Sequence, residues 1–365
     1  MDRRDFLKGT AAASLMATLP SSTWAASGYN PEPGKWSTFD VVTRLEIAKP
    51  GKDMQSWVPL PSINNAEWFR VINNTWKTNG KSVLRNDGKY GANMVHVAWA
   101  DNQDKPFVEV TSRVSMRDRQ IDPRKPRAAA QISAHERQLY LTGTDLIPTT
   151  GIVKETSDKI TKGAKTDLEK VQLIYNWVVE NSARKASTRG CGIGDIAAML
   201  KNNDLTGKCA DINALFVGLA RAAGVPARDV YGLRVAPSKF GYKSLGAGSA
   251  NVTKAQHCRA EAYIANVGWI PVDPADVRKV VLEEPPGNLA LTDQKVLDAR
   301  KALLGSWEGN WLAYNFAHDV QLPGTKHPKL GFLMYPQTQV ASLLLDCLEP
   351  DQMKYSITSK EIPAA

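Results

Sequence analysis

The hydrophobic pattern of this 365-residue chain changes its period part-way along the sequence. Within residues 35–117 apolar and polar residues alternate, as in residues 39–47 and 108–116, which is the period of half-buried strands. Beyond residue 165 apolar residues recur at spacings of three and four, which predicts amphipathic helices. Strand-like segments return after residue 229. Strands followed by helices and a second set of strands predict an α+β fold.

The first 25 residues have the pattern of an export signal. A basic start precedes an apolar stretch around residues 11–19 and small residues ending at Ala25, where a signal peptidase could cut. The run Arg3-Arg4-Asp5-Phe6-Leu7-Lys8 resembles the twin-arginine signal, which carries folded proteins across a bacterial inner membrane, although Asp2 stands where Ser or Thr is more usual. An ordinary secretory signal is the alternative. Either one predicts a periplasmic protein.

The composition excludes several classes of protein. Apolar residues make up 43% of the chain and no apolar run outside the signal approaches 18 residues, so an integral membrane protein is not expected. The net charge of +9 favours anionic surfaces, but no zinc finger, helix–turn–helix or basic-aromatic motif accompanies it, so nucleic-acid binding is not expected. Four cysteines are too few for a disulfide scaffold, although Cys191 and Cys347 could pair after export.

The pattern divides the chain into five expected parts. Asn79-Gly80 between two strand-like segments predicts a tight hairpin in an antiparallel, sandwich-like domain. Residues 117–127 are rich in charge and proline, which is typical of a linker. The expected parts are a signal peptide at 1–25, a β-sandwich-like domain at 26–117, a linker and lead-in at 118–164, a catalytic core at 165–285 and a mixed C-terminal extension at 286–365.

Three helices are expected in the core. The capping box Thr166-Asp-Leu-Glu169 opens a helix that ends near residue 181. Asp195 precedes a short helix over residues 196–200, and a third helix spans residues 209–223.

Cys209 stands in the first turn of the third helix. It lies three residues before Ile212 and shares the apolar face of the helix, so its thiol faces the sheet on which the helix packs. Free backbone amides and the positive end of the helix dipole favour a thiolate there. Lowering a thiol pKa from ~8.5 to ~6 raises the thiolate fraction at neutral pH from about 3% to roughly 90%. Cys209 is therefore a candidate nucleophile, and a small buried apolar cysteine is the alternative.

His257 and Asp273 stand at the open ends of two strand-like segments joined by a short turn. If the turn occupies residues 265–267, Arg259 lies opposite Asp273, and His257 lies diagonally beside Asp273 on the same face. A slip of one residue would separate the two side chains. An imidazole oriented by a carboxylate can hold and return a thiol proton, so we expect both residues to act on Cys209.

Two stretches of the chain resemble the transglutaminase-like superfamily. The segment Gly207-Lys-Cys209-Ala-Asp211-Ile-Asn-Ala-Leu-Phe resembles its cysteine motif, and Gln256-His257 through Gly268-Trp269-Ile-Pro-Val-Asp273-Pro resembles its His and Asp motifs. The resemblance covers about residues 165–276. It implies a papain-like core, with Cys209 as nucleophile, His257 as general base and acid, and Asp273 as the orienting carboxylate. Cys258-Arg259 departs from the family, in which a small residue and then Trp often follow the His.

Other groups have simpler structural interpretations. Residues 190–194 with Asp195 could cradle an anion, but a glycine-rich turn capped by Asp195 explains them as well. A metal site of His257, Cys258 and Glu261 is disfavoured because strand alternation turns Cys258 away from the other two.

Four further features are expected to be structural. His318-Asp319 has no neighbouring nucleophile, and the aromatic residues 307–316 are typical of a core. Asp211 is expected to bind first-turn amides and Arg228 to form a structural pair, with an active-site role left open for either.

These residues together predict an exported thiol enzyme of acyl transfer. Cys209 would form a thioester with an amide or ester carbonyl, and water or an amine would resolve it, so the chain would be an amide or peptide hydrolase or a transamidase. The expected substrates are peptide, protein or peptidoglycan-type amides of the cell envelope, with no cofactor and no metal. The alternative is a catalytically idle binding or assembly module of the cell envelope. Neither hypothesis predicts an oligomeric state.

Overall fold

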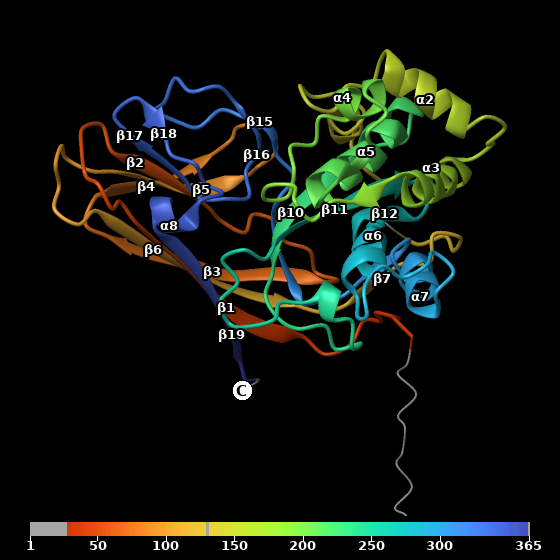
Figure 1. The fold of residues 1–365 in the computed structure, drawn as a ribbon, viewed down its shortest axis with the longest axis horizontal. Coiled ribbons are helices and arrows are strands. Elements are labelled where there is room, and N and C mark those ends of the chain that lie inside the picture. Colours follow the sequence, from red (N-terminus) through yellow and green to blue (C-terminus); the bar gives the residue numbers. More distant parts are fainter. Residues whose placement is uncertain (1–27, 129–130, 364–365) are drawn as a thin grey trace, which may run out of the picture.

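Two antiparallel sheets form a β-sandwich on one side of the protein (Figure 1). The computed structural model describes residues 28–128 and 131–363, so the expected signal peptide lies outside the described residues. The first sheet contains β1 (Ser37–Glu46), β3 (Phe69–Thr78), β6 (Phe107–Met116) and β19 (Tyr355–Ile362), and the second contains β2 (Gln55–Pro59), β4 (Lys81–Asn86), β5 (Asn93–Ala98), β17 (Gln337–Val340) and β18 (Leu343–Leu344). The strand orders are β19-β1-β6-β3 and β18-β17-β2-β5-β4.

Alternation along the strands creates the core of the sandwich. In β1 the buried residues Phe39, Val41 and Leu45 face the same hydrophobic cluster as Val95 and Val97 of β5, which lies in the other sheet. The polar residues between them stay partly exposed. The predicted sandwich-like arrangement is therefore present.

The prediction of a tight hairpin at Asn79-Gly80 is wrong. These residues do connect β3 to β4, but β3 pairs with β6 and β4 pairs with β5, in different sheets. The Asn79 side-chain oxygen accepts hydrogen bonds from Trp99 Nε1 (2.9 Å) and from the Phe107 amide (3.1 Å). The turn therefore carries the chain from one sheet to the other, a long-range outcome that turn composition does not specify.

Strands from the C-terminal part of the chain complete the sandwich. β19 pairs with β1 from Thr38↔Ile362 to Leu45↔Tyr355, and β17 pairs with β2. The sandwich thus draws strands from both ends of the described chain.

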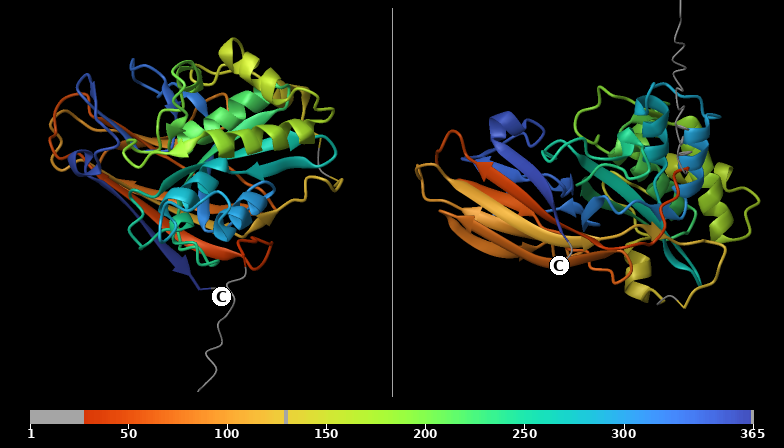
Figure 2. Two further views of the ribbon diagram at one scale, coloured as in Figure 1. Left: turned by 45° about the vertical axis from the view of Figure 1, so that its right-hand side comes forward. Right: turned by 90° about the horizontal axis from the view of Figure 1, so that it is seen from below.

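The other half of the protein is a sheet covered by helices (Figures 1 and 2). Its sheet contains β10 (Ala227–Arg234), β11 (Gln256–Ile264), β12 (Gly268–Val272) and β14 (Trp311–Asn315), in the order β12-β11-β10-β14. Its helices are α1 (Ala134–Leu139), α2 (Ile152–Ile160), α3 (Asp167–Asn181), α4 (Ile196–Lys201), α5 (Cys209–Ala222), α6 (Pro274–Glu283), α7 (Gln294–Ala302) and the short 3₁₀ helix η1 (Lys243–Leu245). The short helix α8 (Pro350–Met353) lies on the sandwich side (Figure 1) and contacts β19. Shorter strands are β7 (Arg119–Gln120), β8 (Ala183–Arg184), β9 (Thr206–Gly207), β13 (Ser306–Trp307), β15 (His318–Val320) and β16 (Leu330–Phe332). The α+β fold expected from the sequence is confirmed.

The capping residues predicted from the sequence do cap their helices. Thr166 and Glu169 form both halves of a capping box at α3, and Asp195 caps α4 through the amide of Ala198. The aromatic residues Trp307 and Trp311 are buried, as expected for core residues. Within residues 28–128 and 131–363, no helix is long and apolar enough to cross a membrane.

Candidate active site

Helix α5 places Cys209 at its first residue and is buried along its whole length. It packs on β10 and β11. One turn after Cys209, the side-chain Nδ2 of Asn213 donates a hydrogen bond to the Cys258 carbonyl of β11 at 2.7 Å. This bond fixes the start of the helix against the strand that carries His257.

The hairpin of β11 and β12 brings His257 next to Asp273. Ile264 pairs with Gly268 and Ala260 with Val272, so the turn occupies residues 265–267 and the predicted register is confirmed. His257 Nε2 lies 2.8 Å from Asp273 Oδ2, and both side chains are buried.

Asp273 is held in place through its other oxygen. As the N-cap of α6, its Oδ1 accepts a hydrogen bond from the Asp276 amide at 3.0 Å, and it also accepts one from Asn213 Nδ2 at 3.2 Å. The carboxylate is therefore positioned by a helix start and by α5 before it contacts the imidazole of His257.

A second carboxylate beside His257 was not expected from the sequence. Asp276 Oδ1 lies 3.3 Å from His257 Nε2 and forms a buried ion pair with Arg234 Nη2 at 2.5 Å. The Trp311 indole N–H donates to the His257 carbonyl at 3.0 Å and fixes the backbone. The sequence does show a second acid three residues after the N-cap Asp273, but its contact with His257 depends on the direction of α6.

The charges around the site favour a thiolate and an imidazolium. Burial disfavours the charged form of Cys209, but hydrogen bonds from Cys191, Cys258 and His257 outweigh it and bring the Cys209 pKa well below its usual value. Burial and Arg234 lower the pKa of His257, but Asp276 and Asp273 raise it, with a net result of about 9. Because both carboxylates occupy Nε2, Nδ1 is the ring nitrogen left for Cys209.

Comparison with known proteins identifies the family of the chain. Residues 154–274 match the transglutaminase-like superfamily, and residues 1–20 match the TAT (twin-arginine translocation) pathway signal sequence. An uncharacterized protein of Haemophilus influenzae is 38% identical over 322 residues, which cover 84% of this chain and 86% of the relative. The chain belongs to the transglutaminase-like superfamily. Its signal sequence directs it across the membrane to the periplasm.

Two solved structures resemble this transglutaminase-like chain at low identity. A proposed cysteine protease from Cytophaga hutchinsonii is 15% identical with a TM-score of 0.49, and the match covers 90% of this chain and 99% of that one. The periplasmic domain of TgpA from Pseudomonas aeruginosa is 15% identical with a TM-score of 0.34, and the match covers 67% and 88%. At these values the likeness carries no conclusion about activity.

Asp211 organises the loop in front of the transglutaminase-like cysteine helix. Its carboxylate accepts hydrogen bonds from the Lys208 amide (2.9 Å) at the helix start, as expected, and also from the amides of Ile193 (3.0 Å) and Gly194 (2.9 Å). A side chain at Gly192 would place its Cβ 1.8 Å from this carboxylate. Residues 190–194 therefore form a turn wrapped around Asp211.

This loop brings a second thiol to Cys209. The Ala210 amide donates to the Cys191 carbonyl at 2.9 Å, and the sulfur atoms of Cys191, Cys209 and Cys258 all lie within 4.8 Å of one another. All four cysteines are free thiols, so the pairing of Cys191 with Cys347 that the sequence left open is not formed.

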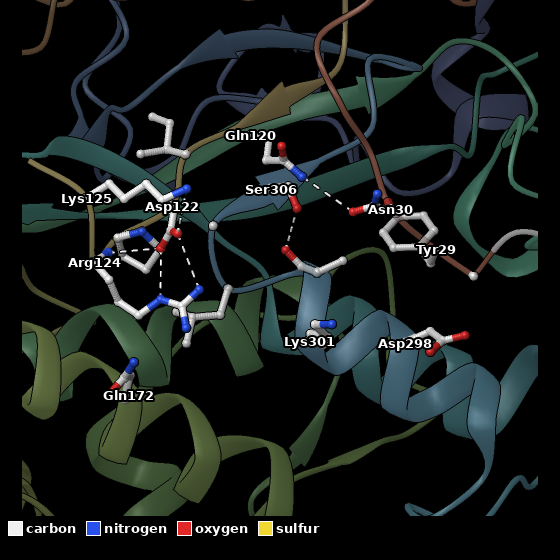
Figure 3. Close-up of a pocket in the computed structure, with 16 residues that line it drawn as sticks. Tyr29, Asn30, Gln120, Asp122, Arg124, Lys125, Gln172, Asp298, Lys301 and Ser306 are labelled. Atoms are coloured by element: carbon white, nitrogen blue, oxygen red, sulfur yellow. Dashed lines mark hydrogen bonds and ion pairs between the residues drawn. The ribbon is translucent and has the colours of Figure 1, made fainter. Parts of the chain in front are cut away.

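The thiol is covered in this structure. Cys209 and His257 are each only 3% exposed. The loop before Cys191 is held against residues 346–349, because Arg189 pairs with Asp346 and Glu349, each at 2.8 Å. The cleft drawn in Figure 3 lies elsewhere, between residues 28–30, 120–125 and 298–306, and does not include Cys209, His257 or Asp273.

The remaining sequence candidates have other partners than Cys209, His257 and Asp273. Arg228 pairs with Glu261 at 2.6 Å, as expected for a structural pair, and this pairing takes Glu261 away from any metal set with His257. His318 Nε2 lies 3.3 Å from buried Asp229, in agreement with a structural role.

Proposed function

We propose that this chain is a periplasmic thiol enzyme that transfers acyl groups from amides or esters, with Cys209 as nucleophile, His257 as general base and acid, and Asp273 as the orienting carboxylate. The observation that carries the proposal is the 2.8 Å contact between His257 and Asp273 beside a thiol whose pKa is held low at the start of α5. A nucleophile, a base within reach and a group that orients the base are the parts that covalent catalysis requires.

The proposed reaction has two halves. The Cys209 thiolate attacks the carbonyl carbon, and the carbonyl π electrons move onto its oxygen, which the Cys209 amide stabilises. As that oxyanion collapses, the carbon–nitrogen bond breaks and the imidazolium of His257 gives its proton to the leaving amine, which leaves a thioester on Cys209. His257 then takes a proton from water, the resulting hydroxide displaces the sulfur, and the acid is released.

The substrate class follows from the compartment and from the chemistry. A periplasmic acyl-transfer enzyme meets peptides, proteins and peptidoglycan-type amides, and we propose hydrolysis of such an amide rather than transamidation. A binding or assembly module with an idle thiol is the second candidate. The deep burial of Cys209 is the observation that favours it, because substrate must reach this sulfur.

Trapping distinguishes the two candidates. The reduced protein is incubated with a cell-envelope extract, quenched in acid, digested and searched by mass spectrometry for acyl groups on the Cys209 peptide. We expect a hydroxylamine-sensitive adduct on Cys209 that the Cys209→Ala variant lacks. A folded protein in which neither the extract nor an activated ester acylates Cys209 supports the binding module.

The His257 imidazole is expected to titrate near pH 9. Its two carboxylates hold the proton, whereas burial lowers the pKa values of His96 and His318. Because the folded pKa is raised, the stabilisation from this proton is complete below ~6.5 and is lost as the pH rises through about 9. Histidine side-chain NMR of the reduced protein measures the midpoint. A His257 midpoint near that of free histidine contradicts the expected ion pair.

A further inference from the structure

Three buried sulfur atoms meet at the start of α5 although they come from three different elements. Cys191 lies on the glycine-rich loop, Cys209 on α5 and Cys258 on β11, and their exposed fractions are 4%, 3% and 0%. Their sulfur atoms all lie within 4.8 Å of one another. The acyl-transfer mechanism requires only one of the three.

The three positions are held by contacts that do not involve the cysteine side chains. The Cys191 carbonyl accepts from the Ala210 amide at 2.9 Å, which ties the loop to the first turn of α5. The Cys258 carbonyl accepts from Asn213 at 2.7 Å, which ties β11 to the next turn. The loop itself is wrapped around Asp211. The three thiols are therefore preorganised.

We propose that Cys191, Cys209 and Cys258 form a binding site for a thiophilic metal ion, Zn²⁺ or Cu⁺, and that a bound ion blocks the Cys209 nucleophile. Both ions take thiolate ligands. With zinc–sulfur bonds of about 2.3 Å, tetrahedral geometry separates two ligand sulfurs by about 3.8 Å. Atoms already within 4.8 Å of one another reach this spacing through movements of about 1 Å or less.

A fourth donor lies beside the cluster. The imidazole of His257 helps to lower the pKa of the Cys209 thiol, and its Nε2 lies 2.8 Å from Asp273 Oδ2. A carboxylate on the far nitrogen is the usual support of a metal-binding histidine. Three cysteines and one histidine form a known zinc donor set, whereas three thiolates alone suit Cu⁺. The donor set therefore leaves the choice between the two ions to experiment.

The proposed metal site does not depend on the proposed acyl transfer. Metal binding needs the three thiols but no substrate, so it stands even if the chain transfers no acyl group. If both proposals hold, the enzyme is active only when the metal-binding position at Cys209 is free.

The test is a titration of the reduced protein with Zn²⁺ alone or Cu⁺ alone, in competition with a chromophoric chelator. We expect one ion per chain. Cys191→Ser and Cys258→Ser should each weaken binding by at least about 100-fold, because losing a ligand costs no less than losing a supporting partner. Cys347→Ser is the matched control, since Cys347 lies outside the cluster. His257→Gln should weaken zinc binding and leave Cu⁺ binding unchanged.

The test can be completed even if one of the variants fails to fold. Cys191 lies on a loop, so Cys191→Ser is the variant to rely on if Cys258→Ser fails to fold. Co²⁺ added in place of Zn²⁺ should give sulfur-to-metal charge-transfer absorption that Cys191→Ser lacks. Failure of both ions to bind, an equal loss of binding in Cys347→Ser, or a disulfide within the cluster of the freshly isolated protein overturns the proposal.

A second readout separates this proposal from the acyl-transfer proposal. Bound metal should protect Cys209 from iodoacetamide, and a chelator should restore the labelling. If the metal-free thiol proves unreactive, the acyl-transfer proposal fails and the binding titration still stands. If the thiol is reactive but no metal binds, the metal-site proposal fails and the acyl-transfer proposal still stands.

Discussion

The Asp273→Asn variant is expected to hold an acyl group on Cys209 about 10²–10⁴ times longer than the native protein. Hydrolysis of the thioester needs His257 to take a proton from water, and Asp273 Oδ2 at 2.8 Å orients the ring and stabilises the charge that forms. An asparagine keeps the shape of the side chain but not its charge. Acetylation by p-nitrophenyl acetate loads the thiol, and intact-mass spectrometry follows the loss of the acetyl group.

A second helix-capping aspartate provides the matched control for this experiment. Asp293 caps α7 through the amide of Lys295, as Asp273 caps α6, but it has no contact with the triad. Asp293→Asn should release the acetyl group at the native rate. Equal lifetimes in the native protein and both variants would remove Asp273 from the proposed mechanism.

The second large effect concerns the thiolate itself. Replacing His257 with Gln should slow the alkylation of Cys209 by iodoacetamide about tenfold or more at about pH 5, because the thiol loses its imidazolium partner. The effect is smaller at neutral pH, since a thiolate of lower pKa is also a weaker nucleophile. Hydrogen bonds from Cys191 and Cys258 remain in the variant and keep part of the pKa depression.

Peptide mapping is needed because the chain has four cysteines. Labelling of the Cys347 peptide serves as the internal reference, since burial raises the pKa of that thiol and no histidine acts on it. A native Cys209 that follows the same pH dependence as Cys347 would contradict an activated nucleophile. The unfolding temperature of the His257→Gln variant shows whether its fold is intact.

Local rules in the sequence were sufficient to predict much of the helix-covered half. The capping box at Thr166, the helix that starts at Cys209 and the register that pairs Ala260 with Val272 all depend on residues close together in the chain. Once the turn occupies residues 265–267, strand geometry alone brings His257 beside Asp273.

Contacts between residues far apart in the chain could not be predicted from the sequence pattern. Nothing near Asn79 indicates that β3 and β4 join different sheets. Cys191 reaches Cys209 only because residues 190–194 fold around Asp211, which makes the three-thiol cluster a tertiary feature. Asp276 is similar, since its place beside His257 depends on the direction of α6.

The pairing of β19 with β1 anchors the C-terminal segment, and this segment in turn contacts the loop that carries Cys191. Residues 346–349, which hold Arg189, precede the short helix α8, and α8 leads into this edge strand. A fusion or deletion that separates β19 from β1 exposes the β1 edge to pairing with other chains, and it also loosens residues 346–349, which hold Arg189 two residues before Cys191. We therefore expect the design of the C-terminus in recombinant protein to change both solubility and thiol accessibility.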